Sequence, residues 1–258
     1  TTERLGSIMG ELTHQTANLL LATNPKNRTA ALILAAGSST RMGGKTSKLF
    51  LSLDGMPVLA HTLLAYQRSP LITEIIIAAK ESDVDAVVAL CNDYRITKLT
   101  AVVIGGANRQ ESALRAFSVI GPEIHYVAIA DGARCLVTPT EIEMVCGEAY
   151  RKKAASAGIR ITGTVKRTTS GGAVLETLDR DTLWEAQTPQ VFHIGLYAAA
   201  QSRAASDGFV GTDDNSLVER LGYRVQMVEC QKDNVKITTP DDLRLAEAIL
   251  ALRRGKKA

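Results

Sequence analysis

The sequence predicts an α/β fold with a mostly parallel sheet, because strand-like and helix-like segments alternate along most of the chain. Short apolar runs, such as Ala-Leu-Ile-Leu-Ala-Ala over 31–36, are typical of strands buried on both faces. The chain has 258 residues, of which 45% are hydrophobic, so it has ample material for a core. We therefore expect one α/β domain, with a projecting arm described below.

The alternation gives the order of the elements in the first half. Strands are expected over 31–36, 72–79, 99–104 and 125–130. Helices are expected over 57–67, from 82 onward, over 109–120 and over 139–156. Asp54-Gly55 predicts a turn, and Pro57 and Pro139 suit the first position of a helix.

The pattern changes in the second half. Two alternating segments, 159–168 and 173–178, are joined by Thr169-Ser-Gly-Gly172 and predict a β-hairpin. A two-stranded ribbon is marginally stable alone, so we expect this arm to lean on a partner subunit. A strand over 184–192 that Pro189 interrupts, a helix over 195–206, a strand over 223–230 and a last helix from Pro240 complete the chain.

These elements divide the chain into three parts. Residues 1–29 form an N-terminal extension, either a short amphipathic helix or a mobile segment. Residues 30–253 form the main domain, in which the arm occupies about 159–182, and 254–258 form a basic tail.

Composition excludes several function classes. The net charge of +3 gives no electrostatic reason to expect nucleic acid. The 4 cysteines and 4 histidines are scattered without a Cys-x-x-Cys pair, which argues against a zinc site or a disulfide framework. No apolar run reaches the ~18–20 residues of a membrane span, and no basic segment precedes a signal-like apolar run. We expect a cytoplasmic protein with reduced thiols and no membrane partner.

The first strand opens into a loop that suits phosphate. Small residues from Gly37 to Gly44 let a backbone approach an anion, and Arg41, Lys45 and Lys48 neutralise its charge. The loop ends in Gly44-Lys-Thr but is no P-loop, because a serine stands where that motif needs its first glycine.

Polar segments also follow the other strands. Ligands bind at the carboxyl ends of strands in an open parallel sheet. The ends here carry 37–48, 105–112, 131–134 and, after the last strand, Lys236. Four suitable strand ends together predict a phosphate site more strongly than any one of them.

Several motifs at these ends resemble a known family. Leu34-Ala-Ala-Gly-Ser-Ser-Thr-Arg-Met42 with Lys48 resembles the signature loop of sugar-phosphate nucleotidyltransferases. The later motifs are Gly105-Gly106 with Arg109 and Ser112, Asp131-Gly-Ala-Arg134, Thr164-Val-Lys-Arg167, Asp179-Arg180, Gln187-Thr-Pro-Gln190, Thr212-Asp-Asp-Asn-Ser-Leu217 and Asp233-Asn-Val-Lys236. As a set, over about 31–252, they resemble the 2-C-methyl-D-erythritol 4-phosphate cytidylyltransferase family of the non-mevalonate isoprenoid pathway.

The resemblance implies a fold and an activity. The fold would be the Rossmann-like three-layer nucleotidyltransferase fold, with a mostly parallel sheet and a protruding β-hairpin arm that interlocks two subunits as a homodimer. The enzyme would transfer CMP from CTP to the sugar-alcohol phosphate and release pyrophosphate. A magnesium or similar divalent ion would bridge triphosphate oxygens, with Asp131 as the nearest candidate carboxylate.

The resemblance also implies roles for individual residues. On the nucleotide side, the backbone of Ala35, Ala36 and Gly37 would wrap CTP, the motif of Gly105, Gly106 and Ser112 would hold the base, and Arg41, Lys48 and Lys236 would grip the phosphates as the catalytic cations. On the acceptor side would lie Asp131, Arg134, Thr188 and Thr212, with Thr164 and Arg180 supplied by the neighbouring subunit.

Four positions depart from the family pattern, and two other functions stay open. Ala107 stands where the family commonly has an acid that reads the cytosine amine, and Gly163 replaces an aspartate. Ser47 replaces a proline before Lys48, and Cys135 replaces one after Arg134. Ribitol-5-phosphate cytidylyltransferase is the first alternative, although Thr212-Asp-Asp-Asn-Ser-Leu217 favours the methylerythritol enzyme. The second is a non-catalytic nucleotide-binding regulatory protein, which would not need the catalytic cations.

Overall fold

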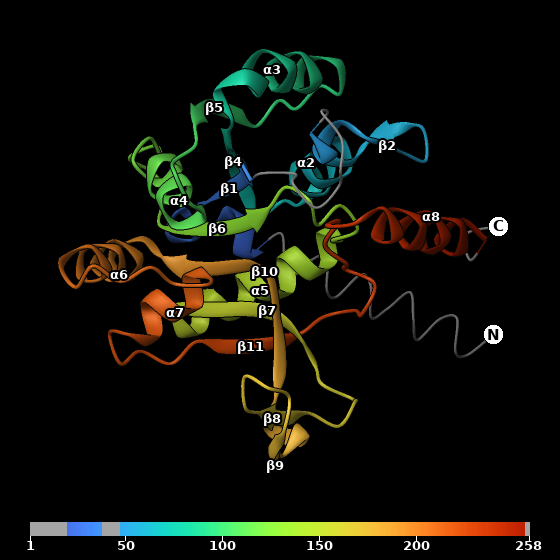
Figure 1. The fold of residues 1–258 in the computed structure, drawn as a ribbon. Helices are drawn as coiled ribbons and strands as arrows, with labels where there is room; N and C mark the ends of the chain where they lie inside the picture. The colour runs from blue at the N-terminus through green and yellow to red at the C-terminus, as the bar shows by residue number, and fades with distance from the viewer. Residues whose placement is uncertain (1–19, 38–46, 256–258) are drawn as a thin grey trace, which may run out of the picture.

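The computed structural model describes residues 20–37 and 47–255, which build a seven-stranded sheet in the order β11-β7-β10-β6-β1-β4-β5 (Figure 1). β10 is antiparallel to both neighbours and the other pairs are parallel. The strands are β1 (Thr29–Ala35), β4 (Ile72–Ala79), β5 (Leu99–Ile104), β6 (Tyr126–Asp131), β7 (Ala154–Arg160), β10 (Trp184–His193) and β11 (Gln226–Glu229). The predicted α/β class and mostly parallel sheet are confirmed.

Helices cover both faces of this sheet, which gives three layers (Figure 1). On one face pack α2 (Val58–Arg68), α3 (Val84–Asp93), α5 (Pro139–Lys152) and α8 (Pro240–Gly255). On the other pack α4 (Arg109–Phe117), α6 (Ile194–Ser206) and α7 (Asp214–Glu219).

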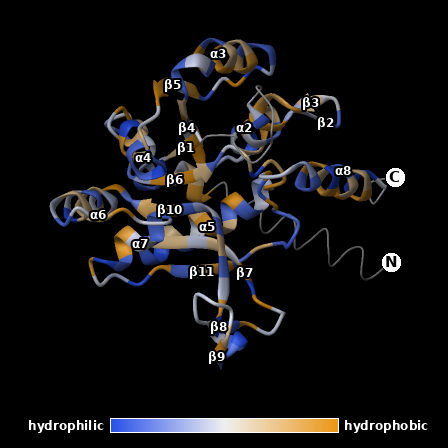
Figure 2. Ribbon diagram, viewed as in Figure 1, coloured by the Kyte–Doolittle hydropathy of each residue, from blue (hydrophilic) through white to orange (hydrophobic). Residues whose placement is uncertain are grey.

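The central strands are apolar because both of their faces are covered. In β1, Ile33 belongs to the core on the α2 side and Leu32 to the core on the α4 side, as the two-residue period of a strand requires. Figure 2 shows the same pattern as orange ribbon through the centre of the sheet. Hence the polar residues of the strand segments collect at the strand ends.

The short elements complete the described chain. They are the 3-10 helices η1 (Pro25–Asn27), η3 (Lys48–Phe50), η4 (Glu81–Asp83) and η5 (Arg180–Thr182), and the strands β2 (Ser52–Leu53), β3 (Met56–Pro57), β8 (Lys166–Thr168) and β9 (Val174–Thr177). The expected turn joins β2 to β3, where Asp54 and Gly55 have φ angles of 52° and 79°.

One predicted helix extends wrongly into a strand of the sheet. The helix expected over 139–156 begins as predicted, with a capping box between Thr138 and Glu141, but it ends at Lys152. Lys153 takes the left-handed conformation, with φ of 65°, and the chain continues as β7 inside the sheet. The small residues Ala-Ala-Ser-Ala-Gly suit a helix locally, but here they fill a crowded strand position. A Cβ on Gly158 would lie 2.4 Å from Met227 Cε.

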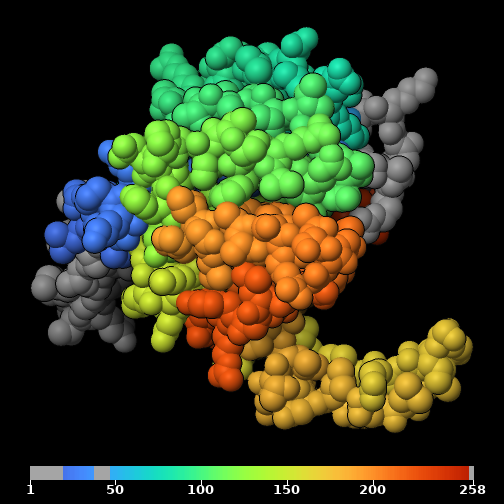
Figure 3. All heavy atoms as spheres, turned by 90° about the vertical axis from the view of Figure 1, so that its left-hand side faces the viewer, coloured from blue at the N-terminus to red at the C-terminus, as the bar shows by residue number. Residues whose placement is uncertain are grey.

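The arm is shorter than predicted, because residues 159–160 belong to β7. Its hairpin is β8 paired with β9, and it stands away from the body of the molecule (Figure 3). Both strands are exposed along their whole length, including the apolar side chains of Val174 and Leu175.

The two ends of the described chain pack on the domain. Leu21 and Ala22, from the predicted extension, contact the core on the α5 side, whereas the amphipathic helix expected around 5–12 lies outside the described residues. α8 runs past the predicted tail boundary to Gly255. There Arg254 Nη1 makes a short ion pair with Asp54 Oδ2, so this residue of the predicted basic tail is held against the turn between β2 and β3. No helix in the described ranges is long and apolar enough to cross a membrane.

Candidate functional site

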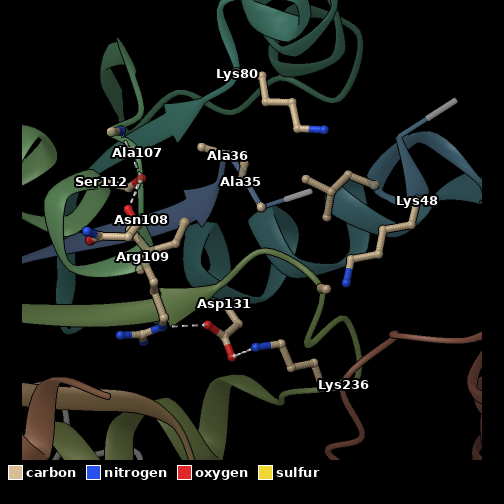
Figure 4. A pocket seen from close by; sticks show the side chains of 15 residues that line it. Ala35, Ala36, Lys48, Lys80, Ala107, Asn108, Arg109, Ser112, Asp131 and Lys236 are labelled. Carbon is tan, nitrogen blue, oxygen red and sulfur yellow. Dashed lines mark hydrogen bonds and ion pairs between the residues drawn. The ribbon is translucent and has the colours of Figure 1, made fainter. Parts of the chain in front are cut away.

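A cavity of about 420 Å³ opens at the carboxyl edge of the parallel strands (Figure 4). It collects residues from the ends of β1, β4, β5 and β6 and from the segment after β11. They are Leu34, Ala35, Ala36, Gly37, Lys48, Leu49, Lys80, Gly106, Ala107, Asn108, Arg109, Ser112, Asp131, Ala133 and Lys236.

Close packing of backbone forms one wall. The Gly105 N–H donates to the Ala79 carbonyl at 2.7 Å, which joins the ends of β5 and β4. A Cβ on Gly105 would lie 2.3 Å from Ala36 Cβ, so only glycine allows the residue after β5 to approach the residue after β1 this closely. This wall therefore presents backbone to whatever fills the cavity.

The first turn of α4 closes the same end. Asn108 caps the helix, since its Oδ1 accepts the Glu111 N–H at 2.8 Å. Ser112 Oγ accepts the Gly106 N–H at 3.0 Å and donates to the Asn108 carbonyl at 2.8 Å. Glu111 Oε2 accepts the Ala107 N–H at 2.9 Å. Ser112 and Glu111 thus fix the shape of the Gly106–Ala107 loop.

Asp131 is the centre of the opposite wall. Its Oδ1 accepts from Arg109 Nε at 3.3 Å, and its Oδ2 lies 2.8 Å from Lys236 Nζ (Figure 4). Arg134 Nε lies 3.7 Å from the same Oδ2. Burial raises the pKa of Asp131, but Arg109 and Lys236 outweigh burial and lower that pKa to about 2. Asp131 is therefore ionised at neutral pH.

Lys236 reaches this wall through a loop, since β11 lies at the far edge of the sheet. The Ile237 N–H donates to the Ala133 carbonyl at 2.9 Å, and Arg134 Nη1 donates to the Asn234 carbonyl at 2.7 Å. Asn234 is fully buried, and its Nδ2 donates to the Thr188 carbonyl at 3.1 Å. Backbone and buried polar contacts thus hold the loop beside Asp131.

The structure brings together most of the predicted site residues. Eight line the cavity: Ala35, Ala36, Gly37, Lys48, Gly106, Ser112, Asp131 and Lys236. Gly105, Arg134 and Thr188 lie directly behind the lining, where Thr188 Oγ1 accepts the Asp131 N–H at 3.0 Å.

Three of the remaining predicted residues lie away from the cavity. Thr164 and Arg180 are exposed on the arm, and Arg180 Nη1 donates to the Thr162 carbonyl at 3.0 Å. Thr212 is exposed just before the cap of α7 and does not line the cavity. Arg41 lies outside the described residues.

Two charged residues of the cavity lining had no predicted role. Lys80 directly follows β4 and points into the cavity (Figure 4), so the rule about strand ends could have identified it. Arg109 stood in a quoted motif without an assigned role. Its Nη1 pairs with the buried Asp214, a partner that no sequence spacing indicates.

The cavity suits a polyanion. Lys48, Lys80, Arg109 and Lys236 line it with Asp131 as the sole carboxylate of the described lining. That lining holds no histidine or cysteine, and the described residues contain no group of three or more His, Cys, Asp or Glu placed to hold a metal. Such a site favours binding and charge neutralisation over attack by a protein nucleophile.

Comparisons with known proteins point the same way. Residues 29–252 match the family model described as IspD: 2-C-methyl-D-erythritol 4-phosphate cytidylyltransferase. The enzyme of that name from Syntrophus aciditrophicus is 41% identical over 232 residues, which cover 90% of this chain and 99% of the relative. The one from Halalkalibacterium halodurans is 40% identical, over 86% of this chain and 96% of the relative.

Solved structures are similar too. The 4-diphosphocytidyl-2C-methyl-D-erythritol synthase of Anaerococcus prevotii superposes with a TM-score of 0.78 at 27% identity, covering 88% of this chain and 99% of that one. The 2-C-methyl-D-erythritol 4-phosphate cytidylyltransferase of Thermus thermophilus gives 0.70 at 29% identity, covering 86% and 98%. With the strand-end cavity, these matches show that the chain belongs to the 2-C-methyl-D-erythritol 4-phosphate cytidylyltransferase family.

Proposed function

We propose that this enzyme transfers CMP from CTP to 2-C-methyl-D-erythritol 4-phosphate, with release of pyrophosphate, in the non-mevalonate isoprenoid pathway. The observation that carries the proposal is that the cavity has one wall of backbone and an opposite wall of charged side chains. Its glycine-rich wall admits a nucleotide, and at the opposite wall Asp131 holds Lys236 Nζ at 2.8 Å.

The reaction needs little covalent work from the protein. A phosphate oxygen of the acceptor attacks the α-phosphorus of CTP, a new P–O bond forms, and the bond to the bridging oxygen breaks as pyrophosphate leaves. Positioning and charge neutralisation dominate such a transfer. Lys236 would stabilise charge on the α-phosphate, Lys48 and Arg41 would bind the departing phosphates, and Gly106 and Ser112 would border the base.

The acceptor would lie on the Asp131 side, beside Arg134, Thr188 and Thr212. Thr164 and Arg180 would come from the arm of a second subunit, so the proposed unit is a homodimer. The arm supports this, because Val174 and Leu175 are 60% and 58% exposed. Apolar side chains on a projecting ribbon are suited to burial in a subunit contact.

A divalent cation such as Mg²⁺ is part of the proposal. Asp131 is the one carboxylate of the described cavity lining, and both of its oxygens already have cationic partners. These residues fit an ion held mainly by phosphate oxygens and water, with at most Asp131 from the protein. When bound, the ion would neutralise triphosphate charge, while the cationic side chains fix the geometry.

We further propose that the enzyme works in the cytoplasm. All four cysteines lie in described parts of the chain and all are free thiols, as expected in a reducing compartment.

Pyrophosphate release from CTP tests the function directly. The purified enzyme should release pyrophosphate with methylerythritol phosphate and Mg²⁺, and much less with ribitol 5-phosphate or without Mg²⁺. UTP in place of CTP tests base selectivity, since Ala107 carries no side-chain acceptor. Release with ribitol 5-phosphate alone would assign the other cytidylyltransferase activity. CTP binding without release would indicate a regulatory binder.

A further inference from the structure

Arg109 joins Asp131, which lines the cavity, to Asp214, which lies behind the lining. Its Nε donates to Asp131 Oδ1 at 3.3 Å, and its Nη1 makes a short ion pair with Asp214 Oδ2. The two carboxylates raise the pKa of Arg109 against the effect of burial, so its guanidinium stays charged. One planar cation thus links the start of α4 to the end of β6 and the start of α7.

Asp214 is the fixed end of this link. Its side chain is 1% exposed, and its Oδ1 accepts from Tyr197 OH at 2.7 Å. Tyr197 is itself buried and accepts from Gln201 Nε2 at 2.7 Å. The backbone N–H of Asp214 donates to Gln190 Oε1 at 2.9 Å. A buried carboxylate with a donor on each oxygen has little freedom to rotate.

Asp131 is held differently. Of its partners, only Arg109, which bonds Oδ1, is itself anchored by a buried carboxylate. Lys236, which bonds Oδ2, is 39% exposed and ends in a flexible chain. Arg134 lies at 3.7 Å, beyond hydrogen-bond distance. The rotation of the Asp131 carboxylate is therefore set by Arg109.

We propose that Asp214 is a positioning residue for the proposed reaction: it holds Arg109, which orients Asp131 and through it Lys236. This inference rests on the proposed function, because Lys236 is the residue assigned to the α-phosphate. Asp214 does not line the cavity and acts only through Arg109.

Asp214→Asn is the first test, since it keeps the shape and removes the charge. We expect kcat to fall about tenfold, because Lys236 would no longer be held at the position that the transfer needs. The CTP dissociation constant, measured by calorimetry, should stay within about twofold, since the backbone wall is unchanged.

Asp207→Asn is the matched control. Asp207 accepts from Arg203 Nε at 2.9 Å and Arg220 Nε at 2.8 Å, so it ties α6 to the end of α7 without a link to Asp131. This variant should keep the parent kcat. An equal loss in both variants would indicate a general effect of loosened helices and would overturn the inference.

A double-mutant cycle isolates the link. If Asp214 acts through Arg109, Asp214→Asn should lower kcat no further in an Arg109→Met background. Additive losses would overturn the inference. Should Asp214→Asn fail to fold, Tyr197→Phe removes the hydroxyl donor but keeps the ring, and kcat should fall by a smaller factor with CTP binding unchanged.

Failure of the proposed function is distinguishable from failure of this inference. An inactive parent enzyme that is folded would contradict the function. In that case a crystal structure of Asp214→Asn still decides: a rotated Asp131 carboxylate would support the link, and an unchanged one would overturn it. An active parent with an equally active Asp214→Asn variant would overturn the inference alone.

Discussion

The two walls of the cavity are built in different ways. The backbone wall, which we propose holds the nucleotide, comes from neighbouring strands joined by the 2.7 Å hydrogen bond from Gly105 to Ala79. The charged wall, which we propose holds the acceptor, is made of side chains from segments far apart in the chain and is centred on Asp131. The first should be sensitive to added atoms and the second to lost charge. We therefore expect that separate substitutions can disturb CTP binding and CMP transfer.

Lys236→Ala should produce the largest effect, because it removes a cation from the charged wall alone. We expect kcat to fall about 100- to 1,000-fold, the usual loss when a donor to transition-state charge is removed. CTP affinity should change only a few-fold, since Lys48 and the backbone wall remain. Stopped-flow pyrophosphate release and calorimetry give the two values. Near-parental turnover would remove Lys236 from the chemical step.

Gly105→Ala should disturb the backbone wall. The new methyl would lie 2.3 Å from Ala36 Cβ and force the strand ends apart, at a cost of about 1–3 kcal/mol in unfolding free energy. CTP binding should weaken about tenfold or more, measured by calorimetry beside a thermal melt. Gly255→Ala is the control, because a Cβ there meets nothing within 4 Å. Unchanged CTP binding in Gly105→Ala would contradict the role given to backbone packing.

Arg180→Ala tests the proposal that a second subunit completes the acceptor site. We expect the acceptor KM to rise about tenfold with CTP binding unchanged, as for the loss of a charged phosphate contact. Mixing this variant with Lys48→Ala should restore activity, since one site of a mixed dimer then has both residues. Without rescue, a site shared between subunits would have to be abandoned.

Lys80→Ala should have a smaller effect. Its side chain points into the cavity (Figure 4) and makes no ion pair with a described residue, so it is available to phosphate. We expect CTP to bind about three- to tenfold more weakly, with kcat little changed. The difference from the parent should be smaller at high salt, because salt screens exposed charges. Lys26→Ala, in the exposed η1 turn, is the control. Equal affinities for both variants would exclude Lys80 from the site.

The smallest effect should come from the thiols. Burial raises the pKa of Cys91 to about 11 and those of Cys135, Cys146 and Cys230 to about 12. These raised values stabilise the fold below the unfolded thiol pKa of about 8.5, and the contribution disappears as pH rises toward 11–12. Unfolding midpoints should fall above about pH 9, and alkylation at about pH 8 should be slow until the chain unfolds. Rapid labelling of Cys135 in the folded enzyme would contradict this.

Much of the fold could be predicted from the sequence. The strands over 72–79 and 99–104 match β4 and β5 residue for residue, because each is a short and largely apolar run with the composition of a strand. The start of β7 could not be predicted, since its alanines suit a helix, and the close neighbours Met227 and Glu185 that require glycine at position 158 are distant in the sequence.

The site divides in the same way. Residues at strand ends or just beyond them, such as Asp131 and Gly106, could be predicted because parallel strands end at one edge of the sheet. The pair of Arg109 and Asp214, separated by 105 positions, depends on how α4 and α7 pack against the sheet. Sequence spacing carries no signal for such a contact.

β10 connects the root of the arm to the residues behind the cavity lining. At its first residue, Trp184 stacks under the Arg160 guanidinium at 4.6 Å, where the arm leaves the sheet. Farther along, the same strand carries Thr188, which receives the Asp131 N–H, and Gln190, which receives the Asp214 N–H. One strand therefore carries both the root of the arm and the side chains that accept hydrogen bonds from the backbone of Asp131 and Asp214.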